Sequence, residues 1–113
     1  MAVKVQVVVC TFPDTETAAR IGSALVEEAL AACINIIPGV RSIYRWEGRI
    51  CDDAEVMGLI KTTEACFDAL RARVVELHPY DCPEVVALPV ADGHPAYLDW
   101  VRHGTTPNHQ PKP

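Results

Sequence analysis

The sequence predicts an α+β domain in which two helices pack on one face of a four-stranded antiparallel sheet. Three observations support this fold class. Short β-branched stretches alternate with segments whose apolar residues recur every three or four positions, in the order β-α-β-β-α-β. Half of the 113 residues are apolar, so one chain can form a single core. No internal boundary or low-complexity stretch divides residues 1–103, which we predict to be one domain.

The predicted elements follow one another through short connections. They are a strand at 3–9 that ends at Cys10, a helix from Thr15 to Cys33, hairpin arms at 34–46 and 50–62, a helix at 64–78, a strand at 84–90 and a short helix at 94–101. Pro38-Gly39 predicts a bend or bulge inside the first arm, and Gly48 lies in the hairpin turn. Pro79 ends the second long helix, because proline disfavours helical backbone at the preceding residue. Residues 104–113 are predicted to form a loose, disordered tail.

This order of elements matches the split-βαβ, ferredoxin-like topology. Right-handed crossovers place the strands in the order 4-1-3-2, with every neighbour antiparallel. Both long helices then cover one face of the sheet, while the other face carries apolar and aromatic side chains, among them Val40, Tyr44 and Trp46. A bare face of that kind would be a large exposed apolar patch. We therefore expect further copies of the chain to cover it, in a closed homo-oligomer whose hairpins reach across to their neighbours.

Charge and composition exclude several classes of partner. The formal net charge is −5 and no Lys/Arg cluster runs along the chain, which disfavours nucleic acid. No segment is long enough to cross a bilayer, and the start of the chain lacks a signal-peptide cleavage site, so we expect a cytoplasmic protein without membrane partners. The five cysteines are widely spaced and include no CxxC pair, which predicts reduced thiols, most of them buried.

The predicted topology brings Cys10, His78 and Glu84 to the same end of the sheet, although 68 residues separate the first two. Thiolate, imidazole and carboxylate together suit a borderline or soft ion, and copper is favoured by the Irving–Williams order. The alternative is structural, with a packed cysteine and a helix-end histidine that contacts carbonyl groups. A nucleophile–base pair of Cys10 and His78 is a weaker alternative, because no local motif supports it, and we do not expect an enzyme.

Five stretches of the chain form a recognisable pattern in the same order: "VVVCTFPD", "LVEEALAACINIIPGVRSIYRWEG", "LIKT", "HPYDCPEVVALPV" and "YLDWV". Together they resemble the CutA family, the divalent-cation tolerance proteins, from about Val3 to Val101. The resemblance implies a ferredoxin-like fold, a tight homotrimer with a PII-like shape, a link to copper and other divalent cations, and no established enzymatic activity. Carried over by position, Cys10, His78 and Glu84 are the candidate metal ligands, and no other cofactor is expected.

The chain departs from the family pattern at two adjacent positions. Asp81 stands where Glu or Gln is common, and Cys82 stands where an apolar residue or threonine is common. The shorter carboxylate of Asp81 puts its family role in question, whereas Cys82 adds a thiol that either binds metal or is merely tolerated at this position. Two other functions stay open: a PII-like signalling trimer that binds a small anionic metabolite in clefts between subunits, and a structural assembly module without a ligand.

Overall fold

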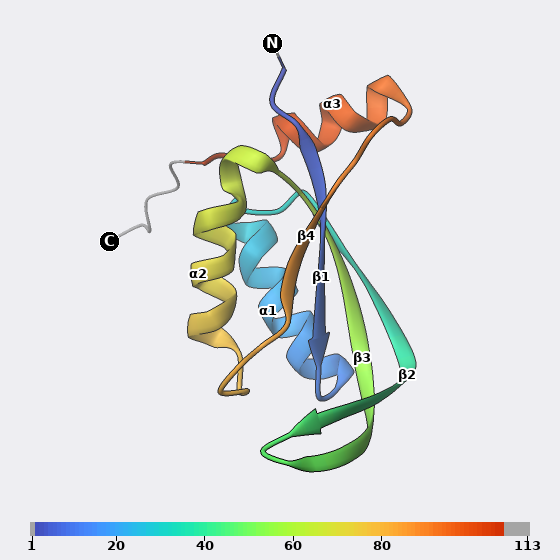
Figure 1. Ribbon diagram of the computed structural model, residues 1–113. Helices are drawn as coiled ribbons and strands as arrows, with labels where there is room; N and C mark the ends of the chain where they lie inside the picture. Colours follow the sequence, from blue (N-terminus) through green and yellow to red (C-terminus); the bar gives the residue numbers. More distant parts are fainter. Residues whose placement is uncertain (1, 108–113) are drawn as a thin grey trace, which may run out of the picture.

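Four strands form one antiparallel sheet in the order β2-β3-β1-β4, with α1 and α2 together on one of its faces (Figure 1). The computed structural model describes residues 2–107. Its elements are β1 (Val5–Phe12), α1 (Thr15–Glu27), β2 (Cys33–Trp46), β3 (Arg49–Thr63), the 3₁₀ turn η1 (Glu64–Cys66), α2 (Phe67–Leu77), β4 (Val85–Pro89) and α3 (Pro95–His103). The predicted fold class, strand order and antiparallel pairing are all confirmed.

The core lies between the sheet and the two long helices. Alternate residues of β1 point toward the helices, since successive side chains of a strand project to opposite faces. Val8, Cys10 and Phe12 are fully buried there, and Val8 is paired in register with the equally buried Ile60 of β3. The helices complete this core with apolar residues at helical spacing, which are Ala18, Ile21 and Leu25 of α1 and Leu70 and Val74 of α2.

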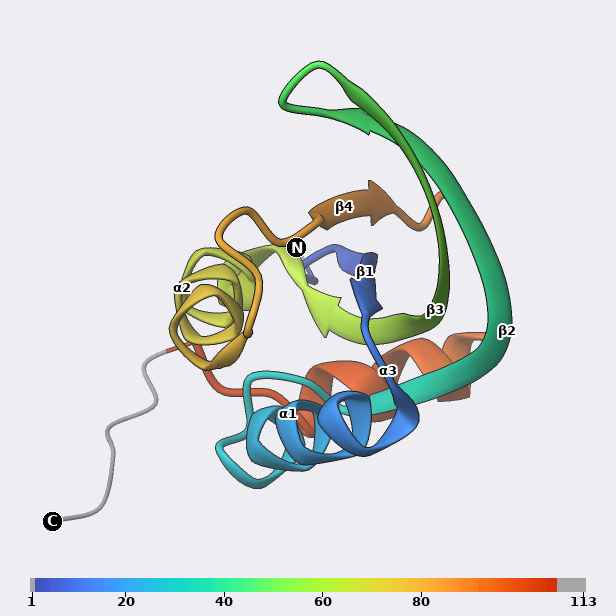
Figure 2. The same ribbon diagram turned by 90° about the horizontal axis from the view of Figure 1, so that it is seen from below.

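The β2–β3 hairpin is the longest feature of the molecule, and its far half bends away from the helices. The pairing register of β2 and β3 shifts between Ile37 and Val40, where the sequence predicted a bend, and Gly39 there has a φ of +80°. Glu47 and Gly48, both with positive φ, form the turn. Figure 2 shows the end of the hairpin curving over toward the side of the sheet where β4 lies.

Most boundaries differ from the predicted ones by one to three residues, and two differences matter for the site and the core. The first strand continues past Cys10 to Phe12, because Thr11 and Phe12 still pair with Met57 and Val56 of β3. The first helix ends at Glu27 and not at Cys33. Asp14 caps its start by accepting a 2.7 Å bond from the Thr17 N–H. The residues after Glu27 have left the helix before the apolar spacing of the sequence ends.

Left-handed backbone at Ala29 produces this early helix end. Ala29 has a φ of 59°, its N–H bonds to the Val26 carbonyl at 3.1 Å, and the Leu30 N–H bonds to the Leu25 carbonyl at 2.9 Å. These two bonds form a Schellman motif, which usually has glycine at the left-handed position. Because alanine stands there, the residue types gave no indication of the stop.

Helix α3 packs across one end of the sheet, against β1 and β3. Its residue Val101 is fully buried, and Val5 and Thr63, which are paired in register, are nearly so. The chain then returns to α1, where the Thr106 N–H donates to the Ala29 carbonyl at 2.7 Å. Residues 108–113 of the predicted tail lie outside the described residues. Within 2–107, no helix is long and apolar enough to cross a membrane.

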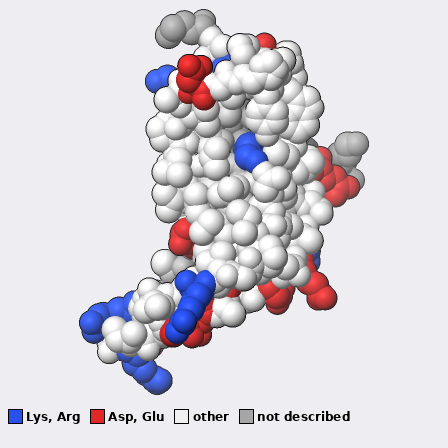
Figure 3. Space-filling view, turned by 90° about the vertical axis from the view of Figure 1, so that its right-hand side faces the viewer, with Lys and Arg blue, Asp and Glu red and all other residues white. Residues whose placement is uncertain are grey.

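The sheet face opposite α1 and α2, here called the open face, is largely apolar. Its side chains come from alternate positions of all four strands: Val7 and Val9 of β1, Asn35 and Ile37 of β2, Met57, Leu59 and Lys61 of β3, and Val86 and Leu88 of β4. Ile37, Val86 and Leu88 are 42–50% exposed. Figure 3 shows this side of the molecule as a broad uncharged surface around a small basic patch, with charged side chains gathered toward the hairpin end.

Candidate functional site

His78 lies at the end of α2, where Pro79 stops the helix and the His78 N–H still bonds to the Val74 carbonyl at 2.8 Å. The side chain is buried and stacks on Phe12 with ring centroids 5.3 Å apart. Its Nδ1 accepts the Tyr80 N–H at 3.1 Å, so Nε2 carries the proton and donates to the Thr11 carbonyl at 2.8 Å. Both ring nitrogens are therefore occupied by backbone groups in this chain.

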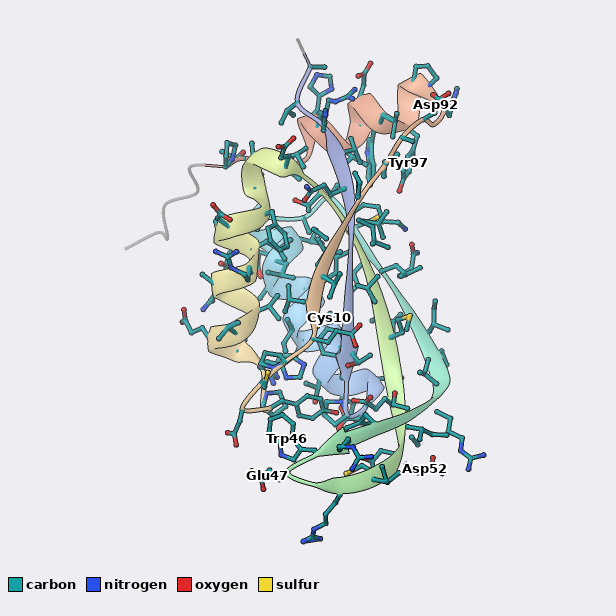
Figure 4. All side chains as sticks on the ribbon, viewed as in Figure 1. Cys10, Trp46, Glu47, Asp52, Asp92 and Tyr97 are labelled. Atoms are coloured by element: carbon teal, nitrogen blue, oxygen red, sulfur yellow. The ribbon has the colours of Figure 1, made fainter. Side chains whose placement is uncertain are left out.

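Cys10 lies on the lower half of β1, beside β4 (Figure 4). Its side chain belongs to the helix-covered core and is fully buried, and its Sγ lies 3.8 Å from the Thr11 carbonyl oxygen. Burial, with smaller effects from the negative charges of Glu84 and Glu55, raises the pKa of the Cys10 thiol to about 12. At neutral pH the sulfur is a protonated, packed thiol, and binding a metal would require release of that proton.

Glu84 follows Pro83 and directly precedes β4, whose first residue, Val85, pairs with Cys10. The predicted convergence of Cys10, His78 and Glu84 at one end of the sheet is thus confirmed at the level of the backbone. Their donor atoms are not gathered around one point, since among residues 2–107 no three His, Cys, Asp or Glu side chains are arranged to hold a metal ion. The metal-binding role of these three residues stays a prediction.

A hollow of about 960 Å³ lies between the curved hairpin and the 80–84 loop. Thr11, the neighbour of Cys10 on the opposite face of β1, lines it together with Glu84. Its charged lining residues within the described chain are four carboxylates and one guanidinium: Asp53, Glu55, Asp81, Glu84 and Arg41. The thiol of Cys82 also lines it. Arg41 is already held by Asp52 in a two-pronged ion pair at 2.9 and 2.7 Å, so the hollow favours cations over anions.

Two phenol–carboxylate pairs form part of the wall of this hollow. Tyr80 donates to Glu55 at 2.7 Å and joins the 80–84 loop to β3. Tyr44 donates to Asp53 at 2.5 Å, within the hairpin. The hydrogen bond to Asp53, more than burial, raises the pKa of Tyr44 to about 12, and burial followed by the bond to Glu55 raises the pKa of Tyr80. Both phenols stay protonated at neutral pH and fix the direction of the two carboxylates.

The sequence did not identify Glu55, Tyr80 or Asp53 as site residues. We expected Tyr44 to lie on the face that further copies of the chain cover. Once Glu47 and Gly48 are fixed as the turn, strand pairing places Asp53 opposite Ser42, within diagonal reach of Tyr44. Hairpin register could therefore have indicated the Tyr44–Asp53 pair. Tyr80 reaches Glu55 only because of the direction in which the hairpin curves, which the predicted bend at Pro38-Gly39 did not specify.

A family model described as CutA1 divalent ion tolerance protein matches residues 6–104, which include Cys10, His78 and Glu84. The divalent-cation tolerance protein CutA of Thermus thermophilus is 54% identical over 100 residues, which are 88% of this chain and 97% of that protein. The chloroplastic protein CutA 1 of Oryza sativa is 46% identical over 99 residues, and the aligned region spans 56% of that longer relative.

Solved structures agree with the sequence matches. The Thermus thermophilus divalent cation tolerance protein superposes with a TM-score of 0.88 at 53% identity, over 90% of this chain and 99% of that one. CutA1 from Oryza sativa gives a TM-score of 0.89 at 44% identity, over 92% of this chain and 95% of that one. Fold, sequence and family model thus converge, and the chain belongs to the CutA1 family of divalent ion tolerance proteins.

Proposed function

We propose that this protein binds a divalent cation, with copper the first choice, in the carboxylate-lined hollow next to Glu84. The observation that carries this proposal is the net negative charge of the hollow. Within the described chain its lining includes four carboxylates and one guanidinium: Asp53, Glu55, Asp81, Glu84 and Arg41. Carboxylate oxygens attract divalent cations, and the Cys82 thiol adds a donor that prefers copper or another soft ion. The description of the family as divalent ion tolerance proteins also supports a cation as the ligand.

Of the three ligands predicted from sequence, Glu84 is the one that lines the hollow. Cys10 and His78 can join a metal only at a cost. Cys10 lies in the core on the opposite face of β1 and must also lose a proton, and His78 must give up a backbone hydrogen bond. We propose that Glu84 is the principal ligand and that Cys10 and His78 add to the affinity when the site rearranges. Binding that recruits Cys10 releases a proton, so it would strengthen as the pH rises.

We further propose that the protein is a homotrimer, as the family resemblance implies. The open face supports this assembly, because Ile37 on one edge strand and Val86 and Leu88 on the other stay about half exposed in the single chain. In such a trimer the donors of a neighbouring chain can complete a coordination shell that residues 2–107 of one chain do not provide. The anionic-metabolite alternative is less favoured, since the carboxylates of the hollow repel an anion.

Calorimetric titration with Cu(II), and with Cu(I) under reductant, tests this function. We expect saturable binding to the wild type that weakens at least about tenfold, or 1.4 kcal/mol, in Glu84→Gln. Glu64→Gln removes an exposed carboxylate from η1, directly after β3, and serves as the matched control. Cys10→Ser and His78→Ala show whether the buried groups take part. Equal affinity of the wild type, Glu84→Gln and Glu64→Gln would refute the proposed site.

A further inference from the structure

Tyr80 connects two walls of the hollow that come from distant segments of the chain. Its N–H donates to the His78 Nδ1 at 3.1 Å, and the centroids of the two rings lie 4.6 Å apart. Its hydroxyl donates to the Oε2 of Glu55, on β3, at 2.7 Å. The side chain is half-buried and lines the hollow itself. The backbone of Tyr80 is therefore held at the end of α2, while its hydroxyl holds the curved hairpin.

The 80–84 loop depends on Tyr80 for its position. Within residues 2–107, the hydrogen bonds of this loop outside the β4 ladder are two, and Tyr80 makes both of them. Pro79 and Pro83 restrict the backbone at the two ends of the loop. Three further side chains of the loop are exposed and line the hollow: Asp81, Cys82 and Glu84. The hydrogen bond to Glu55 therefore sets the distance between these three groups and the carboxylates of the hairpin.

We propose that Tyr80 is a positioning residue for the cation, which through Glu55 holds the hairpin and the 80–84 loop at the separation that a bound divalent ion needs. This inference rests on the proposed function of the hollow. A carboxylate has two oxygens, and the phenol uses the Oε2 of Glu55, so Oε1 is left for the cation. Hydrogen-bond partners that orient a metal ligand in this way typically change metal affinity 10–100-fold.

The second phenol of the hollow shows what is particular to Tyr80. Tyr44 donates to Asp53 at 2.5 Å, but both residues belong to the hairpin, so that bond orients a carboxylate without joining the hairpin to the loop. Burial, followed by the bond to Glu55, raises the pKa of Tyr80, and its hydroxyl keeps its proton at neutral pH. Tyr80 is therefore a donor that holds a ligand in place, and the phenol is not itself an anionic ligand.

Calorimetric titration of the full chain with Cu(II) tests the positioning role. Tyr80→Phe removes one hydroxyl and keeps the ring beside His78, and it is expected to weaken binding about tenfold. Tyr44→Phe removes the equivalent hydroxyl within the hairpin and should lose less affinity. Tyr97→Phe changes α3, which does not line the hollow, and is the control expected to match the wild type. Equal affinity of Tyr80→Phe and the wild type, or equal losses in Tyr80→Phe and Tyr44→Phe, would overturn the proposal.

Melting curves with and without Cu(II) separate positioning from a purely structural role. A structural role lowers both melting temperatures of Tyr80→Phe equally and leaves the copper-induced rise as it is in the wild type. Positioning makes that rise smaller, by roughly 4 °C for a tenfold loss of affinity. An unchanged rise would therefore overturn the proposal.

The same titrations separate this inference from the proposed function. If the wild type does not bind Cu(II), or binds it as tightly as Glu84→Gln does, the cation site is refuted and the positioning role with it. If binding depends on Glu84 and is equally tight in Tyr80→Phe, the positioning role alone is refuted.

Discussion

The two faces of the sheet are made from neighbouring residues of the same strands, yet they have opposite surroundings. In β3, Ile60 is fully buried under the helices, while Leu59 and Lys61 on either side of it belong to the open face. The covered face has its partner within the chain, in α1 and α2. The open face keeps apolar side chains about half exposed, and the proposed homotrimer would cover them with other copies of the chain. The covered face therefore tests the stability of one chain, and the open face tests the proposed assembly.

A charge on the open face should have the largest effect on the molecule. Leu88→Glu places a carboxylate in the apolar patch of β4, where burial in an assembly would cost roughly 3 kcal/mol or more in each copy. We expect the mass measured by light scattering to fall from three times the chain mass to the 12.4 kDa of one chain, with the circular dichroism of a folded domain retained. A trimer mass for Leu88→Glu would show that the open face is not the interface.

Truncating a side chain of the covered face should have the second-largest effect. Ile60→Ala empties a fully buried site and is expected to lower the free energy of unfolding by about 2–5 kcal/mol. Leu59→Ala, one residue away on the open face, should lower the free energy of unfolding by less than about 1 kcal/mol. The Leu59 side chain does not belong to the core between the sheet and the helices. Urea unfolding of both variants in the Leu88→Glu background compares the faces without assembly. Similar losses of stability in Ile60→Ala and Leu59→Ala would show that the two faces contribute equally to the folding of one chain.

Most of this architecture, but less of the site, could be predicted from the residues. Apolar spacing and proline positions fixed the order of elements, the topology and the bend at Gly39, because these depend on local conformation and on chain handedness. The hydrogen bond of His78 Nε2 could not be predicted, since the Thr11 carbonyl reaches that nitrogen only because β1 continues two residues beyond Cys10. Strand alternation, applied to that longer strand, would have shown that Thr11 and not Cys10 faces the hollow.

The thiols of the two faces should differ in reactivity. Cys10, on the covered face, has a pKa of about 12 and is fully buried, so roughly one molecule in a thousand carries the thiolate at pH 9. Cys33, on the open face, is half-buried in the single chain. Peptide mapping after iodoacetamide treatment should find Cys10 unmodified in every form. It should find Cys33 modified in Leu88→Glu and protected in the wild-type assembly, and equal labelling of Cys33 in both would contradict the interface.

The same pKa gives the pH dependence of stability. The folded chain keeps the Cys10 proton that the unfolded chain releases above its pKa of 9.0, so the contribution is complete below pH 9 and is lost as the pH rises toward 12. The free energy of unfolding should therefore decline with pH above 9, and Cys10→Ala should decline less steeply. Urea midpoints between pH 8 and 10.5 measure the two slopes, and identical slopes would contradict the assigned pKa.

Ala29→Gly should have the smallest effect and the opposite sign. Alanine at a φ of 59° is strained, and glycine adopts that conformation without a steric penalty, although it also raises the entropy of the unfolded chain. The balance predicts a gain of about 0.5–1 kcal/mol in the free energy of unfolding. Because Ala29 follows α1 on the covered side of the sheet, away from the open face, the mass of the assembly should not change. Ala19→Gly, in the middle of α1, is the matched control, and it should lose stability by a similar amount, since glycine in a helix interior has no strain to relieve. A loss of stability in both variants would mean that the left-handed conformation of Ala29 is not under strain, and that the helix end is set by the packing of Leu30 against the core alone.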